Sequence, residues 1–146
     1  MGSDQVVVIR LVLAVVLSGL VGLEREVQGR AAGFRTHILV CVGSTLVMLT
    51  AIHLMEIYRG AAIDPGRVAA QVISGIGFLG AGTIIQSGDS VRGLTTAASL
   101  WAVAGIGLAV GSGFYLGAGV TTLLVLAVLL VFSRFEQRVV GSKRKE

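Results

Sequence analysis

Residues 6–23 read VVVIRLVLAVVLSGLVGL, an apolar stretch that contains a single charged residue, Arg10. A helix needs about 20 predominantly apolar residues to cross the hydrocarbon core of a bilayer. In lipid the backbone N–H and C=O groups must bond within the protein, and the stretch lacks the alternation of a half-buried strand. It therefore predicts a membrane-spanning helix.

Four more apolar runs of similar length follow the first one. The five runs cover residues 6–23, 37–57, 68–85, 94–110 and 114–132. Of the 146 residues, 54% are hydrophobic and 14% are charged, whereas soluble domains carry about 25% charged residues. We predict an all-α fold, a polytopic membrane bundle of about five transmembrane helices. Residues 1–133 would form the transmembrane domain and residues 134–146 a basic cytoplasmic tail.

The distribution of lysine and arginine predicts the orientation, because cytoplasmic loops are enriched in these residues. With the N-terminus outside, nine of the twelve fall on the cytoplasmic side. These nine are Arg25, Arg30, Arg35, Arg92, Arg134, Arg138, Lys143, Arg144 and Lys145. The bundle is therefore expected to be N-out and C-in. This orientation explains the net charge of +4 better than nucleic-acid binding does, and no nucleic-acid partner is predicted.

Several residues are expected to mark helix ends. Asp64 and Pro65 resemble an N-cap followed by proline at the first helical position. Thr36 is expected to open the second span, and Thr95 with Thr96 the fourth. Arg10, close to the outer end of the first span, is expected to snorkel outward or to pair with an outer acid.

Glycine accounts for 21 residues and lies among large apolar side chains, which favours close helix packing over a flexible linker. Residues 75–80 read GIGFLG and match the dinucleotide pattern G-x-G-x-x-G, but no strand precedes them and no acid follows at the required distance. We interpret the pattern as helix packing. The small-residue stripe of Ala14, Ser18 and Gly22, and the glycines from Gly105 to Gly119, are expected to pack within one chain in preference to a homo-oligomer, which stays the alternative. The packing candidates are Gly22, Gly75, Gly77, Gly80 and Gly82.

Polar residues near the predicted membrane are candidates for function, because they are costly there. The cytoplasmic candidates are Glu24, Arg25, Glu26, Arg35, Thr36, His37, Asp89, Arg92, Thr95 and Thr96. Within the membrane the candidates are Arg10, Cys41, Gln71 and Ser74, and on the outer side they are Asp64 and Arg67.

Three of these acids, Glu24, Glu26 and Asp89, are weak candidates for a Mg²⁺ site, because Mg²⁺ prefers oxygen ligands. Four arginines accompany them, however, and two predicted helix N-termini there favour anions. An ion-pair network or an anionic lipid head group fits this inventory better than a bare cation, so we predict neither a metal nor a cofactor. No catalytic motif is present, and we expect no enzyme activity.

Several motifs in order resemble the family named for magnesium transport C and SapB (MgtC/SapB). They are GLERE at 22–26, AGFRTH at 32–37, Cys41, DPGRVAAQ at 64–71, SGIGFLGAG at 74–82, VRGLTTAA at 91–98 and Trp101. The resemblance covers residues 10–132 and implies a bacterial inner-membrane protein linked to magnesium limitation, acid stress and virulence. Longer members carry a cytoplasmic domain after the last helix, and we expect a short form that lacks it.

Three functions remain open. The leading hypothesis is a non-enzymatic regulator or adaptor that contacts a membrane partner, which by family resemblance could be the F-type ATP synthase. The second is a magnesium or other cation transporter, with a route along Glu24, Glu26, Gln71, Ser74 and Asp89. The third is a protein that binds anionic lipid through Arg25, Arg35 and Arg92.

Overall fold

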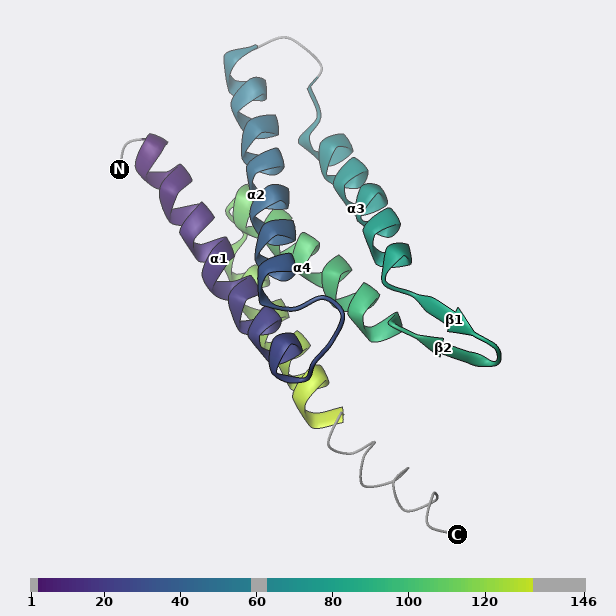
Figure 1. Ribbon diagram of the computed structural model, residues 1–146. Coiled ribbons are helices and arrows are strands. Elements are labelled where there is room, and N and C mark those ends of the chain that lie inside the picture. Colours follow the sequence, from purple (N-terminus) through teal and green to yellow (C-terminus); the bar gives the residue numbers. More distant parts are fainter. Residues whose placement is uncertain (1–2, 59–62, 133–146) are drawn as a thin grey trace.

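The computed structural model describes residues 3–58 and 63–132, which form an all-α membrane helix bundle with one small hairpin (Figure 1). The elements are α1 (Ser3–Val27), α2 (Phe34–Ile57), α3 (Pro65–Gly82), β1 (Ile85–Ser87), β2 (Ser90–Arg92), α4 (Leu94–Ser112), α5 (Tyr115–Ala127) and a π-helical turn (Val128–Phe132). Successive helices run in alternating directions. We call the end where α1 begins the outer end, and the end where it stops the inner end. The predicted basic tail, residues 134–146, lies outside the described residues.

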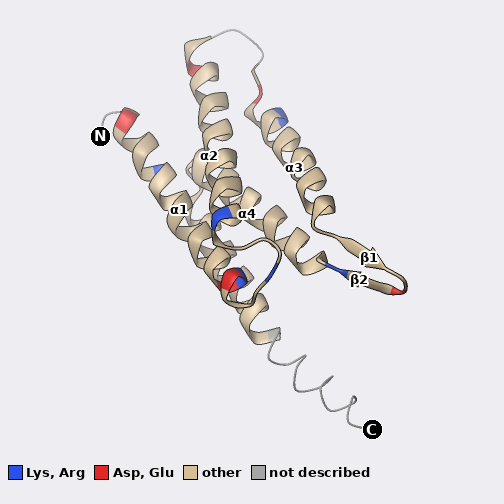
Figure 2. Ribbon diagram, viewed as in Figure 1, with Lys and Arg blue, Asp and Glu red and all other residues tan. Residues whose placement is uncertain are grey.

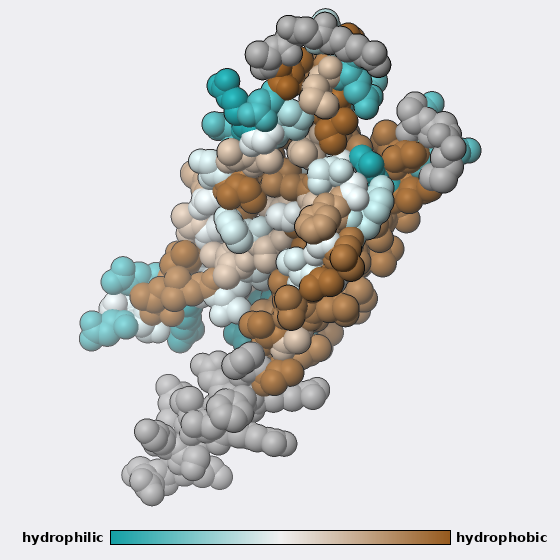
Figure 3. All heavy atoms as spheres, turned by 180° about the vertical axis from the view of Figure 1, so that it is seen from behind, coloured by the Kyte–Doolittle hydropathy of each residue, from teal (hydrophilic) through white to brown (hydrophobic). Residues whose placement is uncertain are grey.

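Three helices of the described chain are long and apolar enough to cross a membrane: Asp4–Val27, Phe34–Ile57 and Leu94–Ser112. The apolar helix Tyr115–Val131 is shorter, and α3 carries Arg67 near its start. Charged residues gather at the two ends of the bundle, and the surface between them is largely apolar (Figures 2 and 3). Three spans thus follow from length and composition, and α3 and α5 stay predicted spans.

Helix α4 lies at the centre, since each of the other four helices packs against it. The buried core combines Val103, Ile106 and Val110 of α4 with Val21, Cys41 and Ala118 of α1, α2 and α5. Lipid tails are as apolar as these side chains, so exclusion of water contributes little between helices in a bilayer. Close packing and dispersion contacts therefore hold the bundle together.

Helices α2 and α4 run parallel, and the same offset in residue number separates their contacting residues at two places along the helices. Thr45 Oγ1 donates a hydrogen bond to the Gly107 carbonyl at 2.9 Å, and His37 Nε2 lies 2.9 Å from Ser99 Oγ. Both pairs are separated by 62 residues in the sequence. The register brings the polar residues near the start of α2 beside those near the start of α4.

Two glycines of α4 let the backbones of α2 and α4 approach closely. A methyl group added at Gly107 would overlap the carbonyl oxygen of Cys41, and one added at Gly111 would lie 2.8 Å from the Thr45 carbonyl oxygen. In both cases the atom in the way is backbone, which cannot turn aside as a side chain can. Glycine at these positions is therefore required by the helix contact.

The N-terminus of α3 has the predicted cap, since Asp64 Oδ1 accepts a hydrogen bond from the Gly66 N–H at 2.8 Å. The helix ends earlier than the apolar run predicted, because β1 begins at Ile85. The hairpin turns at Gly88, which has φ +59°, a conformation that L side chains rarely adopt. Gly93, with φ +92°, then allows the chain to return close to the Thr83 carbonyl.

Helices α2 and α4 begin at Phe34 and Leu94, so Thr36 and Thr95 lie in their first turns, two and one residues after the start. Gly33 and Gly93 occupy the two N-cap positions, and neither cap contains a side-chain hydrogen bond. The Phe34 N–H at the start of α2 has no acceptor within the helix, and it donates to Glu26 Oε2 at 2.9 Å. A carboxylate from the end of α1 thus satisfies the start of α2, which fixes the connection between the helices.

Arg10 forms no ion pair with an acid among the described residues, and its side chain bonds instead to the junction of α4 and α5 at the outer end. Its Nη1 donates to the Gly111 carbonyl at 2.8 Å, and its Nε donates to the Tyr115 hydroxyl at 2.9 Å. Gly111 lies in the last turn of α4, where carbonyls lack helical partners and the helix dipole favours a cation. Arg10 therefore ties α1 to the junction of α4 and α5.

The Gly107→Ala variant is expected to be less stable by ~1–3 kcal/mol, because its methyl group overlaps the backbone of α2. At Gly105 an added methyl meets nothing within 4 Å. Gly105→Ala is therefore expected to be neutral or up to ~1 kcal/mol more stable, since alanine favours helix. Thermal unfolding in detergent, followed by circular dichroism, compares the two. Equal melting temperatures would contradict the close approach of α2 and α4.

Candidate functional site

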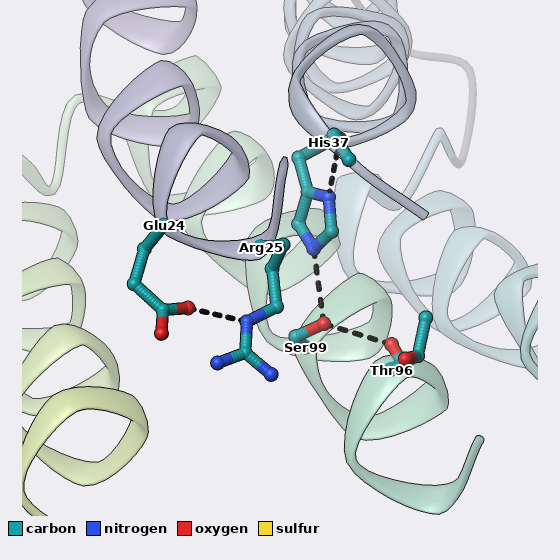
Figure 4. Close-up of polar contacts among 6 residues, drawn as sticks. Glu24, Arg25, His37, Thr96 and Ser99 are labelled. Carbon is teal, nitrogen blue, oxygen red and sulfur yellow. Dashed lines mark hydrogen bonds and ion pairs between the residues drawn. The ribbon is translucent and has the colours of Figure 1, made fainter. Parts of the chain in front are cut away.

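A buried polar cluster occupies the inner end of the bundle (Figure 4). We define it as Glu24 and Arg25 of α1, His37 of α2, and Thr96 and Ser99 of α4. All five are buried, and Arg25 and Glu24 are only 2% and 8% exposed. Charged residues are almost never buried to this degree unless they are paired. The cluster is therefore the part of the described chain where unusual chemistry concentrates.

His37 is held between two helices by hydrogen bonds at both ring nitrogens. Nδ1 lies 2.8 Å from the Gly33 carbonyl oxygen, which can only accept, so Nδ1 carries a proton. Nε2 lies 2.9 Å from Ser99 Oγ, and the same hydroxyl lies 2.8 Å from the Thr96 carbonyl oxygen. The single hydroxyl proton of Ser99 can point to either acceptor. When the His37 ring is neutral, Ser99 donates its hydroxyl proton to Nε2. When the ring is charged, Nε2 itself carries a proton, and Ser99 donates to the Thr96 carbonyl oxygen instead.

Glu24 and Arg25 form a buried ion pair in which Arg25 Nε donates to Glu24 Oε2. The other carboxylate oxygen, Oε1, is buried and has no hydrogen-bond partner in the described part of the chain. Arg25 opposes a cation at this oxygen, and the pair has no net charge. A structural role, or contact with a neutral hydrogen-bond donor, fits this arrangement better than binding of a bare metal ion.

The other predicted cytoplasmic residues do not join the cluster. Glu26, Arg35, Thr36, Asp89, Arg92 and Thr95 are exposed. Asp89 and Arg92 belong to the hairpin, which projects away from the bundle (Figure 2). Among the described residues no group of three His, Cys, Asp or Glu side chains could hold a metal ion. Glu24, Glu26 and Asp89 therefore do not form the carboxylate group that the sequence made conceivable.

Ser99 is the residue of the cluster that the sequence analysis missed. It follows Thr96 by three residues and so shares its helix face, which is a signal that could have identified it. Cys41 lies one turn after His37 and is fully buried in the apolar core. Its thiol contacts the hydroxyl groups of Ser18 and Thr45 and lies outside the polar cluster.

The glycines predicted to pack have two different environments. A methyl added at Gly22 would lie 2.9 Å from Phe34 Cα, and one added at Gly80 would lie 3.5 Å from Ala97 Cβ. At Gly75, Gly77 and Gly82 an added methyl would meet nothing within 4 Å. These three glycines therefore do not pack within the described chain, because they lie on sides of α3 that no other described helix covers.

The polar residues of α3 also face away from the bundle. Gln71 and Ser74 are exposed, and neither has a hydrogen-bond partner among the residues that the structure describes. Near the outer end, a pocket of about 330 Å³ is lined by Ile63, Asp64, Arg67, Val68 and Gln71. Gln71 and Ser74 thus do not face Glu24, as the predicted transport route would require.

Ser99→Ala is expected to destabilise the protein by ~1–3 kcal/mol, because buried His37 Nε2 loses its partner. Thr95→Ala is the matched control, since Thr95 is exposed on the same helix and makes no side-chain hydrogen bond in the described chain. Chemical denaturation in detergent measures both variants. A Ser99→Ala variant as stable as Thr95→Ala would contradict the contact between His37 and Ser99.

Glu24→Ala is expected to cost ~3–5 kcal/mol, because it leaves the Arg25 guanidinium buried without its carboxylate. The same change at exposed Asp89 is expected to alter stability by no more than ~0.5 kcal/mol. Denaturant midpoints of unfolding are measured for both variants, each of which removes one negative charge. Similar midpoints would mean that Arg25 does not depend on Glu24.

Comparison with known proteins places the chain in a family. The model of the MgtC family matches residues 11–138. The putative magnesium transporter YhiD of Escherichia coli is 44% identical over 128 residues, which cover 83% of this chain and 59% of that protein. Protein MgtC of Salmonella typhimurium is 40% identical over 132 residues, which cover 90% of this chain and 54% of that protein.

An uncharacterized protein of Haemophilus influenzae is 42% identical over 139 residues, covering 92% of this chain and 58% of that protein. The chain therefore spans between half and three fifths of the length of these relatives. No solved structure matches it. The family match covers α1 from residue 11 onward and all the later helices described above, and three relatives share at least 40% of the aligned residues. The chain belongs to the MgtC family.

Proposed function

We propose that the chain is a non-enzymatic regulator or adaptor of the bacterial inner membrane, which acts by contact between its helices and those of a membrane partner. The observation that carries this proposal is the uncovered side of α3. There the exposed polar side chains Gln71 and Ser74 lie beside Gly75, whose Cα is open to approach. Small residues let a second helix come close, and polar side chains can then bond across the contact.

The contact side of α3 differs from an ordinary lipid-facing surface. Leucine, isoleucine and valine prefer lipid, whereas an unpaired amide in hydrocarbon is costly. On α4, by contrast, the exposed positions away from the helix ends, Ala98 and Trp101, are apolar. The composition of α3 therefore favours a protein neighbour in the membrane over lipid alone.

The alternative is a cation transporter, the activity that the name of the Escherichia coli relative suggests for that protein. One observation favours it, the unpartnered Oε1 of buried Glu24. Three features weigh against it: Arg25 neutralises Glu24, Gln71 and Ser74 face outward, and Asp89 lies at the tip of the hairpin. We therefore place transport second.

A photo-crosslinking amino acid at position 74 tests the adaptor function in native membranes. The expected product is an adduct with one defined membrane protein, identified by mass spectrometry. Position 105, a half-buried site on α4 where an added methyl meets nothing within 4 Å, serves as control and is expected to capture lipid only. Gly75→Leu should abolish the adduct by blocking close approach, whereas Gly105→Leu should not. Adducts with lipid alone at position 74 would count against the proposal.

Liposomes that contain the purified chain separate the two functions. We expect no magnesium influx above that of empty liposomes. Influx that falls in the Glu24→Gln variant but persists in Asp89→Asn would instead assign transport, with Glu24 on the route.

A further inference from the structure

The side of α3 that faces away from the bundle carries a charged, two polar and an aromatic side chain in sequence along the helix. We call it the outward face and define it by Arg67, Gln71, Ser74 and Phe78, which are spaced by four, three and four residues. This spacing places them on one side of a helix. All four are exposed, and Phe78 is 84% exposed, whereas Ile76 and Gly80 on the opposite side are buried.

Arg67 provides a positive charge at the outer end of this face. It forms no ion pair with any residue that the structure describes. The nearest acid in sequence, Asp64, lines the same pocket but uses Oδ1 to cap α3. The Asp64 carboxylate caps the N-terminus of α3 and offsets the partial positive charge there, so the Arg67 guanidinium is the cation that this pocket offers. The pocket of about 330 Å³ beside Arg67 therefore has room for an anionic side chain, and the guanidinium of Arg67 is the group that would bind it.

Gln71 and Ser74 provide hydrogen-bonding groups deeper along the same face. They follow Arg67 by four and seven residues, which corresponds to roughly 6 Å and 10 Å along the axis. An amide offers two donors and an acceptor, and a hydroxyl offers one donor and an acceptor. A neighbouring helix can therefore satisfy them with one amide or hydroxyl side chain at the matching depth.

We propose that the outward face docks a transmembrane helix that carries a carboxylate level with Arg67 and an amide or hydroxyl one to two turns deeper. This inference rests on the adaptor function and specifies the chemistry of the partner. The guanidinium of Arg67 binds the carboxylate in the outer pocket, where a planar fork suits a carboxylate in two-point contact. Gly75 and Gly82, on the flank of the face, give the partner backbone room to approach.

A synthetic leucine-rich transmembrane peptide serves as the probe, with one glutamate near its end and one asparagine about one and a half turns deeper. Energy transfer between the labelled peptide and the full chain is measured in neutral phosphatidylcholine bicelles. We expect the chain to bind this peptide at least about tenfold more tightly than a version with lysine in place of the glutamate. Replacing the asparagine by leucine should weaken binding about threefold.

Charge reversal in the chain is the sharper arm of the test. Arg67→Glu is expected to invert the preference, so that the lysine peptide binds more tightly, and Arg67→Gln to remove it. Arg35→Glu, at an exposed arginine of the inner end, is the matched control and should leave the preference unchanged. Gln71→Leu should remove the difference between the asparagine and leucine peptides. The melting temperature of each variant shows that the bundle is intact.

Two results would overturn the inference. One is binding that does not distinguish the glutamate and lysine peptides, or a preference that Arg67→Glu leaves unchanged. The other is energy transfer between two copies of the chain that Arg67→Glu abolishes, because a second copy would then cover the outward face. Neither result refutes the adaptor function, which the crosslink at position 74 tests separately, because that crosslink detects a membrane partner of any chemistry.

Discussion

The close approach of α2 and α4 is the contact on which the rest of the bundle depends. At Gly107 and Gly111 the two backbones come too close for any side chain, and the contact fixes a constant register along both helices. That register places His37 opposite Ser99 and leaves the remaining surface of α4 to α1, α3 and α5. In lipid such steric fit has to supply what exclusion of water supplies in a soluble core.

Helix α1 shows how a membrane protein deals with charge inside a bundle. Arg10 donates to the last turn of α4 at the outer end, and Arg25 pairs with Glu24 at the inner end. Each guanidinium thus has an acceptor within the protein, as a medium of low dielectric requires. Glu24 Oε1 is the exception, because this buried oxygen has no hydrogen-bond partner among the described residues.

Helix α3 leaves one side uncovered by the other described helices, and this exposed side is where the proposed function lies. Only α2 and α4 share extensive contacts with it. Its uncovered polar side chains and open glycines are hard to reconcile with lipid as the only neighbour, and they fit a partner helix. Glu26, Asp89 and Gln71, which the predicted transport route would have to join, lie on separate surfaces of the described chain.

The sequence alone determined the helices, since long apolar runs have few solutions in lipid, and it identified the Asp64 cap and the family. It also marked Glu24, Arg25, His37 and Thr96 as functional candidates. Only the tertiary structure decided which candidates meet, because burial depends on the side of each helix that faces its neighbours. Arg35 and His37 are two residues apart, yet Arg35 is exposed and His37 is buried. Ser99 joins the cluster through the α2–α4 register. Among the four glycines between residues 75 and 82, Gly80 is packed and the other three are open, although the sequence does not distinguish them. The helix contacts that make these distinctions join residues about 60 positions apart, which no local pattern encodes.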